Sequence, residues 1–224
     1  MKISPETQTI LKNFAGINKG ILFVPGTVLR TRTDSVFAEA RVNEDFPVEK
    51  SIFDLANFLN VLGLFDNPEL EFEDGALRIS ESNGSAETLY GYAGAATVTL
   101  PFPKKMRPVP ERVIEFSLSE EQWTKMQKAA SIFQKPEYKI VSDGKTVRMS
   151  TANHKHEKGN SFSIVLDAKA NGLKCKMVYA KEHLNLMKGA YTGVVTPTYT
   201  LFKHTAIDLT YYIGVEPTAS QFDE

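Results

Sequence analysis

The sequence has 224 residues, which is enough for one large domain or for two domains of about 110 residues with separate apolar cores. Hydrophobic residues make up 42% and charged residues 24% of the chain, as in ordinary soluble globular proteins, and no apolar run is long enough to span a bilayer. The formal net charge of −1 disfavours a protein that grips nucleic acid through a broadly basic surface.

The ends and the cysteine content indicate a reducing compartment. Residues 1–5 lack the apolar stretch of a secretory signal. The single Cys175 has no partner for a disulfide within the chain. A cytoplasmic location is therefore expected.

Helical spacing appears in four segments, and the first two lie in the N-terminal half. One runs from about Ser4 to Gly16, with Ser4 as N-cap and Pro5 at the first helical position. The next runs from about Asp54 to Phe65 and begins with Asp54 as N-cap. Both carry apolar residues at the spacing of one helix face.

The other two predicted helices lie in the C-terminal half. One begins at Ser119, because Ser119 and Gln122 have the spacing of a capping box. The last is short and runs from about Lys181 to Lys188. The residues expected to face the core are Trp123, Met126, Ala130 and Phe133 in the third helix, and Leu184 and Met187 in the fourth.

Short alternating apolar runs fill most of the remaining chain and predict antiparallel strands. Asp74-Gly75 and Asp143-Gly144 separate pairs of such runs, as in β-hairpins. Residues 100–110 carry four prolines and no periodicity, which predicts a linker. The sequence thus predicts an α+β chain with two similar domains, 1–106 and 107–224, each with two helices packed on antiparallel sheets.

Two stretches, KNFAGINKGI at 12–21 and FDLANFLNVLGLF at 53–65, are typical of one protein family. They resemble the sliding clamps of T-even-type tailed bacteriophages. The segments 117–134 and 180–191 fall where that family places its third and fourth helices, and DLTYYIGVEP at 208–217 looks like the last strand of the broader cellular clamp fold. The resemblance extends in weaker form over nearly the whole chain.

The resemblance implies a function as well as a fold. It implies a non-enzymatic homotrimer, a closed ring of six domains that encircles duplex DNA without sequence preference and tethers the replicative DNA polymerase. It also implies an ATP-driven clamp loader as partner, no cofactor, and work in the cytoplasm of the infected bacterium. A further role in transcription is compatible with the family.

Exposed helical lysines are the candidate DNA-facing residues. Their common feature is a position on the wet side of a predicted helix, where amphipathic helices commonly carry lysine whether or not they bind DNA. Residues 1–109 carry 11 Lys and Arg against 14 Asp and Glu, whereas residues 110–224 carry 15 against 13, so the second half should supply more of this charge. The candidates are Lys12, Lys125, Lys128, Lys181 and Lys188.

A pocket for partner peptides is expected, by resemblance, where the linker crosses the sheet beside the final strand. Apolar residues in such a linker would otherwise be exposed without purpose. They would equally serve to fasten the linker to its own domain. The candidates are Leu100, Phe102, Pro103, Val215 and Pro217.

Two other functions remain open at this stage. One is a β-rich phage structural or assembly protein, which would not require basic helix faces. The other is a small enzyme built on His154, His156 and Glu157, whose spacing suits zinc, but the site would need a further ligand, and we expect no metal. No nucleophile elbow, phosphate-binding glycine loop or zinc-finger spacing occurs.

Overall fold

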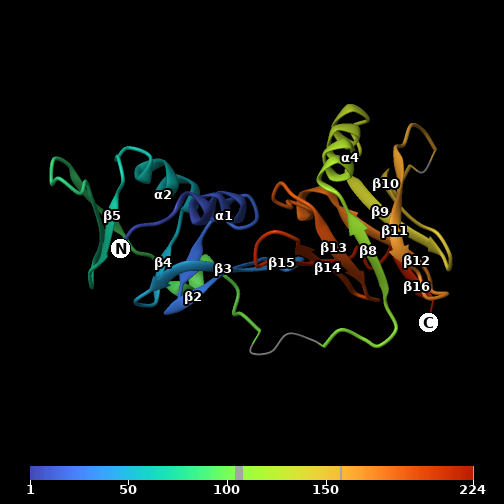
Figure 1. Ribbon diagram of the computed structural model, residues 1–224, viewed down its shortest axis with the longest axis horizontal. Coiled ribbons are helices and arrows are strands. Elements are labelled where there is room, and N and C mark those ends of the chain that lie inside the picture. The colour runs from blue at the N-terminus through green and yellow to red at the C-terminus, as the bar shows by residue number, and fades with distance from the viewer. Residues whose placement is uncertain (104–107, 157, 224) are drawn as a thin grey trace. The chain divides into compact units, whose positions relative to one another are not determined.

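The structure is a computed structural model that describes residues 1–103, 108–156 and 158–223. The chain divides into two compact units, Met1–Pro103 and Lys104–Glu224, and the boundary falls within the expected linker. Each unit combines helices with antiparallel sheets (Figure 1), so the predicted α+β class is confirmed. Among the described residues, no helix combines the length and apolarity needed to cross a membrane.

The first unit contains two helices with N-terminal caps, as the sequence predicts. Helix α1 covers Pro5–Ala15, and the Ser4 hydroxyl accepts a hydrogen bond from the Thr7 N–H at 3.2 Å. Helix α2 covers Leu55–Leu62, and the Asp54 carboxylate accepts one from the Asn57 N–H at 2.9 Å. These bonds satisfy N–H groups that have no partner within the first turn of a helix. A four-residue helix, α3 (Ala95–Val98), was not predicted.

The strands of the first unit form three antiparallel groups, β1 with β4, β2 with β3, and β5-β6-β7. Asp74-Gly75 makes the β5–β6 turn as predicted. The Phe23 ring of β1 stacks on that of Phe46 in β3 with centroids 4.8 Å apart, and Phe58 of α2 meets Phe23 edge to face. Aromatic packing therefore holds α2 against these strands. The bounds are β1 Ile21–Phe23, β2 Gly26–Arg32, β3 Val36–Phe46, β4 Lys50–Ile52, β5 Glu69–Phe72, β6 Ala76–Ser80 and β7 Glu87–Gly91.

The strands of the second unit follow one another in the spatial order β16-β12-β9-β10-β11-β8-β13-β14-β15. Asp143-Gly144 makes the β9–β10 turn as predicted. The bounds are β8 Ile114–Leu118, β9 Glu137–Asp143, β10 Val147–Ala152, β11 Ser163–Lys169, β12 Lys174–Ala180, β13 Tyr191–Val195, β14 Tyr199–His204, β15 Leu209–Gly214 and β16 Gln221–Asp223.

Helix α4 (Glu120–Ile132) covers one side of strands β9 and β10 (Figure 1). Ser119 and Gln122 form the predicted capping box. Trp123 is buried and lies 5.3 Å from Tyr138, measured between ring centroids, so the apolar face of the helix points at the sheet. The helix ends one residue before Phe133, which is half-buried rather than part of the core face.

The predicted fourth helix is wrong. Only Lys181–His183 are helical, as a single 3₁₀ turn called η1, and residues 184–190 form a loop. Two tyrosines bond the backbone of Met187: the Tyr191 hydroxyl donates to its carbonyl at 2.5 Å, and the Tyr211 hydroxyl accepts from its N–H at 3.2 Å. The Tyr211 hydroxyl thus takes the N–H that an α-helix over 181–188 would pair with the His183 carbonyl.

Candidate functional site

Two of the predicted DNA-facing lysines lie on the exposed face of α4. Lys125 and Lys128 are exposed, whereas Trp123 and Met126 on the opposite face are buried. The Lys125 ammonium lies 2.6 Å from the Glu121 carboxylate one turn earlier, and this hydrogen bond lowers the pKa of Glu121. Lys128 has no ion pair within the described part of the chain. The charge of Lys125 is therefore partly neutralised by Glu121, whereas that of Lys128 is not neutralised by an ion pair among the described residues.

The segment 181–188 runs beside α4 even though it is not an α-helix. The Lys181 ammonium lies 3.5 Å from the Ser131 hydroxyl, near the end of α4. The Lys188 ammonium lies 3.2 Å from the Glu120 carboxylate, in the first turn of α4. The two lysines thus lie at opposite ends of the helix, on its flank.

Acidic residues nearly balance this group of lysines. The α4 face, which we define as α4 together with residues 181–188, carries four lysines and three glutamates, Glu120, Glu121 and Glu182. Because all these side chains are exposed, their mutual attraction is weak and is screened by salt. The α4 face is therefore only slightly positive, and any contact with phosphate is expected to be weak.

Lys12 lies on α1 in the other unit. It is exposed in the last turn of the helix, whereas Ile10, Leu11 and Phe14 are buried. A lysine at this end is favoured by the helix dipole, which is a sufficient structural reason for its presence. Its association with the α4 face remains a prediction.

The candidate pocket residues are divided between the two units. Leu100 and Pro103 are exposed at the end of the first unit, and the half-buried Phe102 ring lies 6.2 Å from that of Phe37, measured between centroids. This packing supports a role for Phe102 in holding the linker to its own unit. Val215 is half-buried and Pro217 exposed in the second unit.

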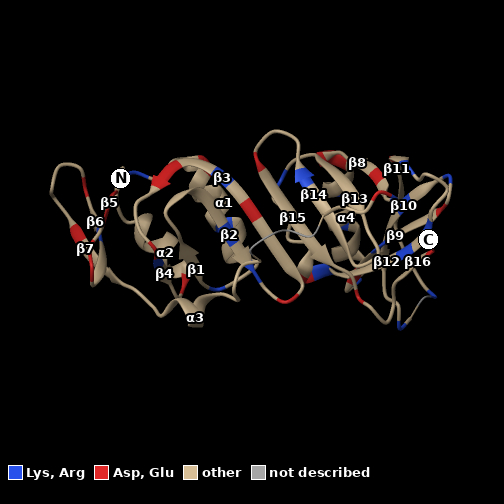
Figure 2. Cartoon of the chain, turned by 90° about the horizontal axis from the view of Figure 1, so that it is seen from below, with Lys and Arg blue, Asp and Glu red and all other residues tan. Residues whose placement is uncertain are grey.

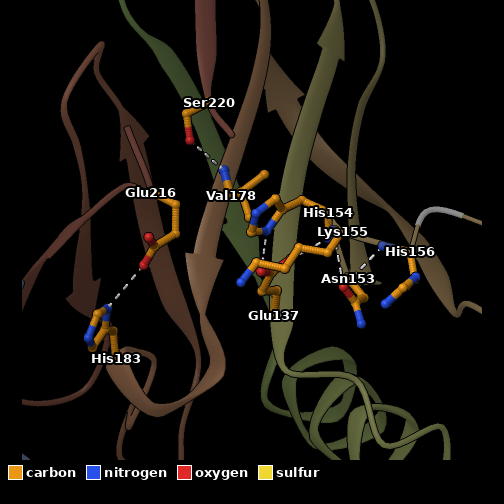
Figure 3. Close-up of polar contacts among 9 residues, drawn as sticks. All are labelled: Glu137, Asn153, His154, Lys155, His156, Val178, His183, Glu216 and Ser220. Atoms are coloured by element: carbon orange, nitrogen blue, oxygen red, sulfur yellow. Dashed lines mark hydrogen bonds and ion pairs between the residues drawn. The ribbon is translucent and has the colours of Figure 1, made fainter. Parts of the chain in front are cut away.

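The backbone around Val215 is tied to neighbouring strands. The Val215 N–H donates to the Thr198 carbonyl at 3.3 Å, and the Glu216 N–H donates to the Val178 carbonyl at 2.8 Å. The Glu216 carboxylate in turn lies 4.0 Å from His183 (Figure 3). This end of the expected pocket is therefore held in place, whereas its pairing with the linker stays a prediction.

The two histidines of the loop after β10 point in different directions. His154 points at Glu137, with Nδ1 2.5 Å from the carboxylate, and its backbone N–H donates to the same carboxylate at 2.7 Å (Figure 3). His156 points away from this pair (Figure 3). Among the described residues, no three His, Cys, Asp or Glu side chains form a metal-type group, and Glu157 lies outside those residues.

Sequence reasoning missed two exposed apolar side chains on strands with open edges. Leu89 on β7 is 57% exposed and Val165 on β11 is 50% exposed. Strand β7 lies at the edge of its sheet. Strand β11 lies between β10 and β8, but among the described residues only Asp167–Lys169 pair with β8, whereas Ser163–Leu166 pair with β10 alone. The alternating pattern identifies Leu89 and Val165 as strand residues, but only the strand pairing shows where backbone edges are left open.

Comparison with known proteins identifies the family. Residues 4–88 match the family model described as DNA polymerase processivity factor. The sliding clamp of Vibrio phage KVP40 is 28% identical over 96% of this chain and 99% of its own, and that of Enterobacteria phage T4 is 34% identical over 51% of each chain. The structure of PCNA from Thermococcus kodakaraensis is similar in fold, with a TM-score of 0.65, 14% identity and coverage of 94% of this chain and 96% of that one. These comparisons support a sliding clamp like those of T-even-type bacteriophages, and the chain is a DNA polymerase processivity factor.

Proposed function

We propose that three copies of the chain close into a ring around duplex DNA, with α1 and α4 facing the duplex, and that the ring tethers the replicative polymerase. The proposal includes opening by an ATP-driven loader, no catalysis by the chain itself, and action in the cytoplasm of the infected host. The observation that carries it is the α4 face, where exposed lysines lie over a buried apolar face and are nearly balanced by glutamates.

A nearly balanced surface suits a ring that slides. A protein that holds DNA by charge alone neutralises many phosphates and stays in place at low salt. A closed ring is instead retained by topology, so loose contacts to phosphate are sufficient to guide it. The low net charge of the α4 face fits this second case.

The two open-edged strands support closure of the ring. A ring of identical subunits needs two different surfaces on each copy, one to pair with the other on the next copy. Strand β7 belongs to the first unit and β11 to the second, and each exposes a large apolar side chain, Leu89 or Val165. We therefore propose that β7 of one copy meets β11 of the next.

Light scattering tests the ring. At micromolar concentration the wild type is expected to show about three times the chain mass of 25.0 kDa. Leu89→Asp and Val165→Asp should each shift the population toward monomer, because an unpaired carboxylate would be buried at the contact. Val109→Asp, a change at an exposed apolar linker residue, is the control. A protein that remains monomeric or forms only a two-fold dimer at all concentrations would exclude the ring.

Retention on DNA tests the α4 face. Loaded wild type should persist on nicked circular DNA and run off the same DNA when it is linear, which simple electrostatic binding does not explain. Lys125→Glu with Lys128→Glu should impair loading and processive synthesis, while Lys145→Glu with Lys174→Glu makes the same charge change elsewhere in the unit. If the α4 double variant loads and supports synthesis as well as the wild type at two salt concentrations, α4 does not face the duplex.

Calorimetry with a polymerase-derived peptide tests the pocket. Val215→Asp and Phe102→Asp should weaken binding of the peptide and leave the trimer intact, because each places a charge in an apolar groove. Phe102 also packs on Phe37, so a thermal melt must accompany that variant. Unchanged peptide affinity in both variants would show that the pocket lies elsewhere.

A further inference from the structure

A small basic hollow of about 40 Å³ lies in the second unit, where β9, β10 and β12 meet the loop after β10. None of the residues that line it belongs to the α4 face or to the expected peptide pocket. Its polar lining residues are Lys135, Lys139, Lys176, Thr151, Asn153, His154 and Ser161.

The hollow has an excess of positive charge. Three lysines line it, and no Asp or Glu stands among its lining residues in the described part of the chain; Figure 2 marks lysines of β9 and β12 in blue. The neighbouring Glu137 is 8% exposed, and both of its carboxylate oxygens contact His154. Neither Lys135 nor Lys139 has an ion pair within the described part of the chain. The lining is therefore basic, and a space of about 40 Å³ suits a small acidic group.

The lining is held in position by its own hydrogen bonds. The Asn153 side-chain oxygen accepts from the N–H groups of Lys155 and His156 at 3.1 and 3.2 Å (Figure 3). The Thr151 hydroxyl accepts from the Phe162 N–H at 3.0 Å, which ties the far end of the loop after β10 to this strand. A ligand would thus meet a lining that is already ordered.

The hollow opens on the side of the sheet away from α4. Tyr138 packs on Trp123 of α4, and successive side chains of a strand point to opposite faces, so Lys139 points the other way. If α4 faces the duplex, encircled DNA does not reach this side. This step rests on the proposed function.

We propose that this hollow binds a carboxylate side chain of an acidic segment in a partner protein. The opposite charge of the lining selects an anionic group, and the small volume admits one carboxylate at a time. Lysines suit this role because an ammonium group attracts a carboxylate from many directions. They also bind phosphate, and the titration with inorganic phosphate distinguishes the two anions.

The proposal can be tested without DNA or a loader. The full chain is titrated with a capped tetraglutamate peptide, and binding is monitored by the NMR chemical shifts of the backbone amides. Amides of residues 151–156 should shift, and Lys135→Gln with Lys139→Gln should weaken binding by about fivefold or more. Lys145→Gln with Lys174→Gln removes the same charge outside the hollow and should change the affinity by less than about twofold. The charge-preserving Lys135→Arg with Lys139→Arg should retain binding.

Three results would overturn the proposal. One is equal weakening by the two glutamine variants, which would mean general attraction only. Another is binding of inorganic phosphate at residues 151–156 without binding of the peptide, which would make this a small oxyanion site. The third is a short DNA duplex that displaces the peptide and loses affinity in the Lys135/Lys139 variant. Because none of these titrations needs a ring, failure here leaves the clamp function untouched, and failure of the ring leaves this site untouched.

Discussion

Replacing Gly189 with alanine tests how the loop that carries Lys188 is held. Gly189 has a φ of +149°, a conformation that side chains rarely adopt, and a Cβ added there would lie 2.0 Å from His204 Nε2. His204 is only 7% exposed, and its ring meets Tyr191 edge to face at 5.1 Å between centroids. The ring therefore has little room to move aside.

The expected cost has two parts. The backbone strain of a non-glycine residue at this φ is about 1–3 kcal/mol. The second part comes from the hydrogen bonds of His204. Its Nδ1 accepts from the N–H groups of Ala206 and Ile207 at 3.1 and 3.3 Å. Nε2 therefore carries the proton, and it donates to the Lys188 carbonyl at 3.2 Å. Displacing the ring weakens these bonds, at about 1 kcal/mol each. We expect Gly189→Ala to lower the free energy of unfolding by about 4–6 kcal/mol.

Two other glycines separate strain from collision. Gly172 has a φ of +76° and open space around it, so Gly172→Ala should cost about 1 kcal/mol. Gly193 has no such φ, but a Cβ there would lie 2.0 Å from the buried Phe116 ring, so Gly193→Ala measures collision alone. Urea unfolding of the three variants gives the comparison. If Gly189→Ala lowers the free energy of unfolding by no more than Gly172→Ala, the loop can rearrange to admit the methyl group and His204 does not hold it in place.

Three further predictions concern single groups. Ser119→Ala removes the capping bond to the Gln122 N–H and should destabilise the chain by about 1 kcal/mol in urea unfolding; no change would mean that the cap is redundant. Partial burial raises the pKa of Glu44, but hydrogen bonds from Thr7 and neighbouring backbone outweigh it and the net pKa is lowered. Glu44 should therefore stabilise the fold above about pH 4.5 and lose this effect as the pH falls further. Glu44→Gln should lower the melting temperature more at pH 7 than at pH 3. An equal decrease at the two pH values would contradict this. Burial raises the pKa of the Cys175 thiol to about 11, so Ellman's reagent at pH 8 should label it only after unfolding; rapid labelling of the native chain would show that the thiol is accessible.

Local signals in the sequence were sufficient for the helices that begin with a cap. Ser4, Asp54 and Ser119 each bond the backbone three residues on, so the pattern and the physical cause lie within one turn. The two Asp-Gly hairpins were predictable for the same reason, since turn geometry and register are both local. The overall class follows from these elements.

Distant side chains decided the elements that were mispredicted. Residues 181–188 have helical spacing, but Tyr191 and Tyr211 bond the Met187 backbone, and both come from later strands. The pairing of Lys188 with Glu120 spans many residues and has no local signal, whereas the i, i+4 spacing of Glu121 and Lys125 could have been read from the sequence. The basic hollow likewise draws on several strands and a loop.

The pairing of lysines with glutamates along α4 follows from two demands on one surface. A helix that begins with glutamates is stabilised by its dipole, so Glu120 and Glu121 favour the first turn of α4 whatever the helix faces. On the proposal that α4 faces the duplex, guidance of DNA needs positive charge on the same exposed face, but a ring retained by topology needs only a small amount. Lys125 and Lys188 lie beside these glutamates, which satisfies both demands. The pairing reduces the attraction of the two lysines for DNA and keeps the glutamates in the first turn of the helix. Lys128, which has no ion pair among the described residues, then contributes most of the remaining positive charge of α4 itself.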